Sequence, residues 1–135
     1  MNQEIKEKKP HFRKQESGYH SSAVRILASW VNGKTEQPFT YGGKILFVPD
    51  VTCYKNGILE CIYEVVHSHP LSAKKYGLIQ EWCYRNYTDL SVFEISADFI
   101  LRQTEKPEII ETMEYYTVSL FEFEDIQDSL IESIK

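Results

Sequence analysis

Residues 48–66 read VPDVTCYKNGILECIYEVV and contain the strongest local signals for the fold. The pair Asn56-Gly57 is a strong signal for a β-hairpin, because both residue types tolerate the positive φ of a two-residue turn. The apolar run before the pair predicts one strand, and residues 58–66 predict the strand that returns. Pro49 has no backbone N–H to donate, so it implies an edge strand, a bulge or a strand start at that point.

The same stretch places two carboxylates on the two strands of the hairpin, Asp50 and, fourteen residues later, Glu64. Two carboxylates on neighbouring strands can share a hard divalent cation, since Mg²⁺ needs only one or two of them plus water. The register decides whether they meet. A two-residue turn at 56–57 puts Asp50 opposite Tyr63, with the carboxylates on opposite faces of the sheet. A three-residue loop at 55–57, with its glycine left-handed, puts them on one face, and Lys-Asn-Gly suits that loop.

The chain on either side of the hairpin has the periodicity of an α/β protein. Apolar residues recur at spacings of three and four before Asn32-Gly33, a pair suited to a left-handed helix cap. Serines and a proline precede a second helical segment, which Asn86 closes. The resulting expectations are helices at 15–31 and 73–85, and strands at 39–41, 45–54, 58–66 and 89–96.

The predicted order is therefore α-β-β-β-α-β. A helix between two strands favours parallel or mixed pairing, so we expect one small mixed β-sheet core with flanking helices. A C-terminal extension at 104–135 adds a β-rich stretch, 115–123, and a helix. The apolar face of that helix can serve as a homodimer interface or pack on its own sheet; it carries Ile126, Leu130, Ile131 and Ile134.

Composition indicates a single folded domain. The chain has 135 residues, 42% hydrophobic and 26% charged. No apolar run approaches the roughly 18 residues that cross a bilayer, and the N-terminus lacks the apolar stretch of a signal peptide. We therefore expect a cytoplasmic protein without membrane contact. The three cysteines form no C-x-x-C pair and are expected to be buried free thiols; they are Cys53, Cys61 and Cys83.

Charge is distributed unevenly along the chain, whose net charge is -5. Residues 1–14 form a polar, basic arm, and residues 104–135 are acidic. The arm is either simply solvated or touches a phosphate backbone. The overall acidity argues against tight non-specific binding to nucleic acid.

Several residues in this order resemble the PD-(D/E)XK nuclease superfamily, and most closely the nuclease domain of CoiA-like competence proteins. They are Pro49-Asp50 and Glu64-x-Val66, a preceding helix with Glu16 and His20, and a following helix with Gln80-x-x-x-Tyr84. The resemblance covers about residues 15–100 within one nuclease-like domain at 15–135. It implies a restriction-endonuclease-like fold, and metal-dependent hydrolysis of phosphodiester bonds in DNA. The form of the DNA stays open, with branched and single-stranded DNA among the alternatives.

The resemblance also implies roles for individual residues. Asp50 and Glu64, with the carbonyl of Val65 and the carboxylate of Glu16, would hold Mg²⁺ or Mn²⁺. Gln80 would orient the catalytic site. Contacts to nucleic acid are implied for three residues, His20, Arg25 and Tyr84.

The main departure from the family is Val66, which stands where a catalytic lysine is normal. Valine can neither hold a water nor neutralise phosphate. Some superfamily members recruit the lysine from the following helix, where Lys74 and Lys75 are candidates. Two alternatives stay open: a catalytically degenerate nuclease fold that binds nucleic acid or protein, and an unrelated small α/β domain. His67-x-His69 is too small a ligand set to predict a zinc site.

Overall fold

The computed structural model describes residues 11–120, with side chains described from residue 18 onward. Three helices and six strands form within this range. In chain order they are α1 (His11–Val31), β1 (Phe39–Tyr41), β2 (Lys44–Phe47), β3 (Val51–Lys55), β4 (Ile58–Val66), α2 (Ala73–Arg85), β5 (Leu90–Ser96), α3 (Ala97–Arg102) and β6 (Glu114–Val118). The α/β class predicted from the sequence is confirmed.

The strands form two sheets, where the sequence predicted one. β1 and β2 pair as a separate antiparallel hairpin, and the four-stranded sheet has the order β3-β4-β5-β6. Within it β4 and β5 are parallel, as predicted, and the other two pairings are antiparallel. The expected strand 45–54 is broken at residues 48–50, because Pro49 cannot donate to a ladder. Four strands therefore precede α2 instead of three.

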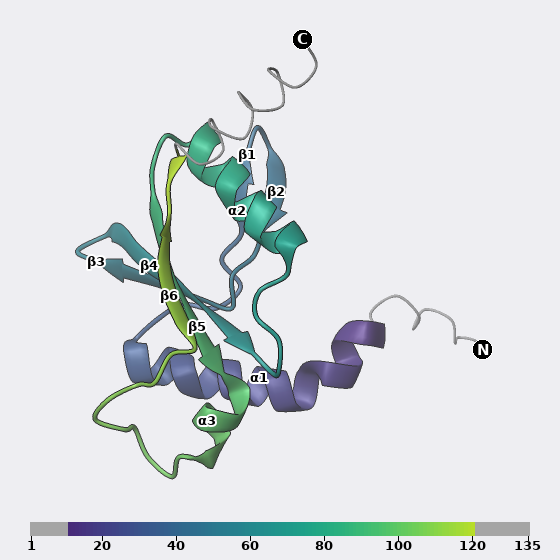
Figure 1. Cartoon of the computed structure of the whole chain (residues 1–135), viewed down its shortest axis with the longest axis vertical. Helices are drawn as coiled ribbons and strands as arrows, with labels where there is room; N and C mark the ends of the chain where they lie inside the picture. The colour runs from purple at the N-terminus through teal and green to yellow at the C-terminus, as the bar shows by residue number, and fades with distance from the viewer. Residues whose placement is uncertain (1–10, 121–135) are drawn as a thin grey trace.

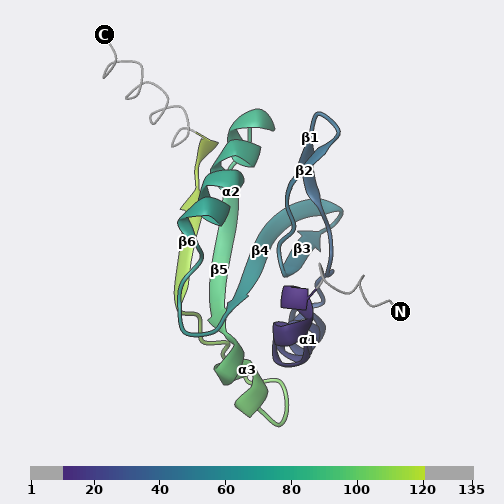
Figure 2. The same cartoon turned by 90° about the vertical axis from the view of Figure 1, so that its right-hand side faces the viewer.

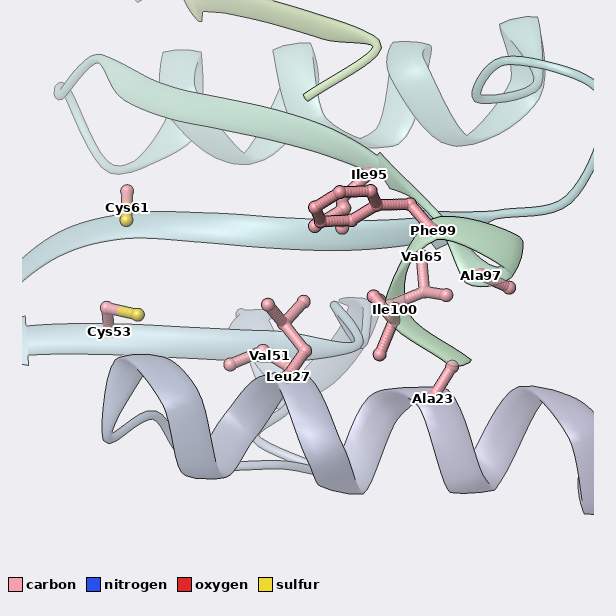
Figure 3. Close-up of a cluster of buried hydrophobic side chains, with 10 residues drawn as sticks. All are labelled: Ala23, Leu27, Val51, Cys53, Cys61, Val65, Ile95, Ala97, Phe99 and Ile100. Atoms are coloured by element: carbon pink, nitrogen blue, oxygen red, sulfur yellow. The ribbon is translucent and has the colours of Figure 1, made fainter. Parts of the chain in front are cut away.

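Each face of the four-stranded sheet is covered by different elements. Figures 1 and 2 show α1 and α3 at one end of the molecule, and α2 with the β1–β2 hairpin at the other. Ala23 and Leu27 of α1 point toward the sheet, against Val51 and Val65 (Figure 3). The second core cluster lies between α2, the small hairpin and the opposite face; it contains Phe39, Phe47, Ile62, Ile79, Cys83, Leu90, Val92 and Val118.

The helix boundaries follow the local chemistry. Asn32 has a φ of 54° beyond the end of α1, and Ser72 caps α2 by accepting a hydrogen bond from the Lys75 N–H at 3.1 Å. α1 begins at His11, so residues 11–14 of the expected arm are helical. Helix α3 was not predicted. Residues 121–135, including the expected C-terminal helix, lie outside the described residues, and no helix among residues 11–120 is long and apolar enough to cross a bilayer.

Gly33 lies where the chain leaves α1 and approaches the sheet closely. A Cβ at this position would be 2.4 Å from Val51 Cγ1 and 3.2 Å from the carbonyl oxygen of Thr52. Val51 is fully buried, so it has little room to move. We expect Gly33→Ala to lower the free energy of unfolding by about 1–3 kcal/mol, measured by urea denaturation.

Gly77 provides the matched control, because it lies inside α2 and a Cβ there would meet no heavy atom within 4 Å. Gly77→Ala should raise the free energy of unfolding by about 0.5–1 kcal/mol through helix propensity. If both substitutions change stability equally, the close approach at Gly33 does not constrain the fold.

Candidate functional site

Asp50 and Glu64 are brought together by a β-bulge in the hairpin. The turn is the two-residue Asn56-Gly57 type, with φ values of 54° and 78°, and next to it Tyr54 pairs with Leu59. The register then shifts, so that Cys53 pairs with Cys61 and Val51 with Tyr63. The extra residue in β4 is Glu60. Continuing this register by one residue places Asp50 opposite Glu64, on the same face.

Neither register considered from the sequence is the observed one. The two-residue turn forms, and by itself it would leave Asp50 and Glu64 on opposite faces of the sheet. The extra residue of the bulge shifts the register by one and returns both carboxylates to one face. The carboxylates consequently share a face for a reason different from the proposed three-residue loop. The backbone N–H of Asp50 donates to Glu64 Oε2 at 3.3 Å, and the N–H of Val65 donates to Asp50 Oδ2 at 2.7 Å. Backbone groups thus orient both carboxylates.

The two carboxylates differ in their exposure to solvent. The side chain of Asp50 is 20% exposed, and that of Glu64 only 4%. Burial and the neighbouring charge of Asp50 raise the pKa of Glu64 to about 7, against the opposing effects of Lys75 and the Asp50 N–H. A cation beside this pair would favour its ionised form.

Lys75 provides such a positive charge from the first turn of α2. Its Nζ donates to Glu64 Oε1 at 2.7 Å and to the carbonyl oxygen of Val48 at 3.1 Å. Val66, the residue at the family's lysine position, is buried at the end of β4. Of the two lysines considered, the structure brings Lys75 to the carboxylates, whereas Lys74 is exposed on the same turn.

Two histidines extend the cluster toward solvent. His20 Nε2 lies 3.1 Å from Asp50 Oδ1, and His20 Nδ1 lies 3.4 Å from His67 Nε2. The ring of Tyr19 stacks on His67, and its hydroxyl donates to Asp98. The hydrogen bond to Asp98 raises the pKa of Tyr19. His67 was not predicted as a member of this cluster, because in the sequence His67-x-His69 suggested only an incomplete zinc ligand set.

Glu94 is a second buried carboxylate, for which no role was predicted from the sequence. It pairs in register with Glu64 on the parallel neighbour β5 and is 3% exposed. Its Oε1 accepts from the N–H of Leu71 at 3.1 Å, and its Oε2 accepts from the Tyr116 hydroxyl at 2.6 Å. Through the bond to Leu71, Glu94 holds the segment that precedes α2 and Lys75 against strand β5. A carboxylate within the apolar strand 90–96 was the signal that could have found it.

Tyr116→Phe is expected to lower the free energy of unfolding by about 1–3 kcal/mol, because it leaves a buried oxygen of Glu94 without this donor. Tyr115→Phe is the control on the same strand, since Tyr115 is 55% exposed, and its effect should stay within about 0.5 kcal/mol. Equal effects in urea denaturation would show that the hydrogen bond to Glu94 contributes no stability.

The remaining predicted site residues lie at various distances from the carboxylates. Glu16 is on α1, in the part whose side chains are not described. Arg25 is exposed, with Nη2 3.5 Å from Ser22 Oγ. Gln80 is 8% exposed on the buried face of α2. Tyr84 follows Lys75 by nine residues, about 14 Å along the helix axis, and its ring lies near the Arg85 guanidinium.

The donor set around Asp50 and Glu64 suits a hard divalent cation. Among the described side chains, no group of three or more His, Cys, Asp or Glu residues is arranged to hold a metal ion. Mg²⁺ nevertheless needs only one or two carboxylates, with water completing its octahedron. The carboxylates of Asp50 and Glu64 offer oxygen ligands of the type that these ions prefer, and His20 Nε2 contacts Asp50 Oδ1 at 3.1 Å. The residues present therefore fit Mg²⁺ or Mn²⁺.

Comparison of the chain with protein-family models, with curated proteins and with solved structures finds no match. The resemblance to nucleases therefore stays a prediction that rests on the sequence of this chain.

Proposed function

We propose that this protein is a metal-dependent nuclease that hydrolyses phosphodiester bonds in DNA, built on a restriction-endonuclease-like core. One observation carries the proposal: the carboxylates of Asp50 and Glu64 share a face at the hairpin, and Lys75 Nζ lies 2.7 Å from Glu64 Oε1. The succession of α1, the β3–β4 hairpin, α2 and the parallel strand β5 supports the proposed core.

Asp50 and Glu64 would hold Mg²⁺ or Mn²⁺ in this function, and the Val65 carbonyl belongs to the same strand end. The bound ion would supply an activated water and stabilise charge that builds on the scissile phosphate. The backbone N–H groups of Asp50 and Val65 fix the carboxylates in place before any substrate arrives.

Lys75 would supply the positive charge that Val66 cannot. Its stem crosses from α2 to the strand ends, and its ammonium group is held by Glu64 and by the Val48 carbonyl. A phosphate oxygen that reaches the carboxylate pair would therefore meet this ammonium group. His20 and His67 add hydrogen-bonding groups at the more exposed side of the site. Arg25 lies on the exposed surface of the same helix as His20.

A second candidate function is nucleic-acid binding without cleavage. The observation that favours a scaffold over an enzyme is the Lys75 ammonium group, which already satisfies the buried Glu64 carboxylate as a structural ion pair would. In that case the nuclease fold would be kept as a scaffold, and divalent ions would not be needed.

The nuclease proposal is tested with duplex, single-stranded and branched DNA, each incubated with Mg²⁺ and with Mn²⁺. We expect Lys75→Met to reduce the cleavage rate by about 10–100-fold, because charge on the phosphate loses its partner. Lys74→Met is the matched control on the same helical turn, where the lysine is exposed, and it should retain cleavage within about twofold.

The outcomes separate the two candidate functions. Absence of cleavage with every substrate and both ions, together with salt-sensitive DNA binding, supports the binding scaffold. Cleavage that both variants retain equally would remove Lys75 from the mechanism.

A further inference from the structure

Cys53 and Cys61 face each other across the β3–β4 hairpin. They are register partners on neighbouring strands, on the side of the bulge nearer to Asp50 and Glu64. Both side chains belong to the core cluster on the α1 face, and Figure 3 shows them one above the other on adjacent strands. Directly opposed residues in an antiparallel pair have Cβ atoms about 4.5–5.5 Å apart, and a disulfide, whose Cβ atoms lie about 3.5–4.5 Å apart, needs them to approach by about 1 Å.

The two thiols are also hydrogen-bonded to each other. A hydrogen bond between them lowers the pKa of Cys53, and the same bond together with burial raises the pKa of Cys61. Cys53 is therefore the better nucleophile of the pair, because the thiolate is the form that attacks a disulfide.

A cavity connects the pair to the surface of the sheet. Its volume is about 340 Å³, and its lining includes Val31, the last residue of α1. Both cysteines line it, with Val31 and an aromatic row formed by Tyr63, Phe93 and Tyr115. The third cysteine, Cys83, is fully buried in the other core cluster, on the α2 face. Only one pair among the described cysteines thus combines mutual contact with access from a cavity.

We propose that Cys53 and Cys61 form a thiol–disulfide exchange site that reacts with a low-molecular-weight disulfide and closes to an intramolecular disulfide. This site is separate from the proposed nuclease activity and does not depend on it.

The reaction balances with the small disulfide as the oxidant. The Cys53 thiolate, formed by loss of its proton to solvent, attacks one sulfur of the disulfide and releases one thiolate. The Cys61 thiol gives its proton to that released thiolate, and its sulfur then attacks Cys53 Sγ. The Cys53–Cys61 bond forms and the second small thiolate leaves, taking up the proton that Cys53 lost. Two electrons and two protons pass to the small disulfide, which becomes two thiols.

The consequence is a covalent link across the hairpin next to the bulge. The link would fix the Cys53–Cys61 pairing, and with it the register that places Asp50 opposite Glu64. Closing a short loop removes conformational freedom from the unfolded chain, so the oxidised protein should melt about 5–10 °C higher.

The test uses the whole chain, incubated with glutathione and glutathione disulfide at graded ratios, quenched with acid, and analysed by alkylation and peptide mass spectrometry. We expect a peptide pair joined through Cys53 and Cys61, in the native protein and in Cys83→Ser alike. Cys61→Ser should instead accumulate glutathione on Cys53, because the closing sulfur is missing. Melting curves of each protein establish that it is folded under these conditions.

Three results would overturn the proposal. One is that the native protein keeps both thiols reduced at every ratio while folded. Another is that it accumulates glutathione adducts without the internal link, and the third is that Cys83 is modified as readily as Cys53.

Discussion

Glu64→Gln is expected to reduce Mn²⁺-dependent DNA cleavage by at least about 100-fold and to abolish tight Mn²⁺ binding, as measured by calorimetry. The reason is the position of Glu64 between Asp50 and Lys75, with one oxygen bonded to each. Glutamine keeps the shape of the side chain but removes the negative charge that would hold the ion. Because the change also removes a buried charge, it should not unfold the protein.

Glu60 is the matched control, since it is a glutamate on the same strand, exposed at the bulge. Glu60→Gln should keep cleavage and Mn²⁺ binding within about twofold of the native protein. If Glu64→Gln cleaves DNA as fast as Glu60→Gln, the carboxylate pair is not the catalytic centre, and the binding scaffold becomes the better proposal.

The parts of the fold that the sequence predicted well are those set by local chemistry. Helix α2 begins directly after the capping Ser72 and ends before Asn86, whose backbone N–H donates to the carbonyl oxygen of Trp82. The Asn56-Gly57 turn has the positive φ values that its residues favour. Such signals act over a few residues, so one sequence is sufficient to identify them.

The register of the hairpin was not predictable in the same way. A turn sets the first pairs, but the extra residue Glu60 changes every pair beyond it. The bulge allows exposed Glu60 to stay in solvent while Cys61 and the residues after it enter the sheet. That choice depends on packing against α1 and α2, which the local sequence does not contain.

Prediction of the site was limited in the same way, because local signals were visible in the sequence and tertiary contacts were not. The pairing of Asp50 with Glu64 was predicted because the two carboxylates fall on the two strands of one hairpin, where they can share a divalent cation. The selection of Lys75 over Lys74 depends on the rotation of α2 about its axis. The contribution of His67 depends on where the end of β4 meets α1. Both are tertiary contacts between segments distant in sequence, so the hydrophobic periodicity of a single segment cannot predict them.

The free energy of unfolding should fall as pH rises from 5 to 8, because Glu64 loses its proton over this range in the folded protein. The pKa of this carboxyl is about 7 in the folded protein and close to its ordinary value of 4.5 when unfolded. Between these pH values the folded state binds more protons than the unfolded state does. The stabilisation that comes from protonated Glu64 is therefore fully present below pH 4.5 and is lost as pH rises through 7. At about 1.4 kcal/mol per unit of pKa, the loss between pH 5 and 8 is about 2.5 kcal/mol.

Urea denaturation of the native protein and of Glu64→Gln at both pH values isolates this effect, because glutamine does not titrate. The native protein should lose about 2.5 kcal/mol more than the variant between pH 5 and 8. Lys75→Met gives an independent check, since the ammonium group lowers the Glu64 pKa and its removal should move the transition to higher pH. Parallel pH profiles for the native protein and Glu64→Gln would mean that Glu64 is ionised throughout. The ion pair with Lys75 would then fully compensate its burial.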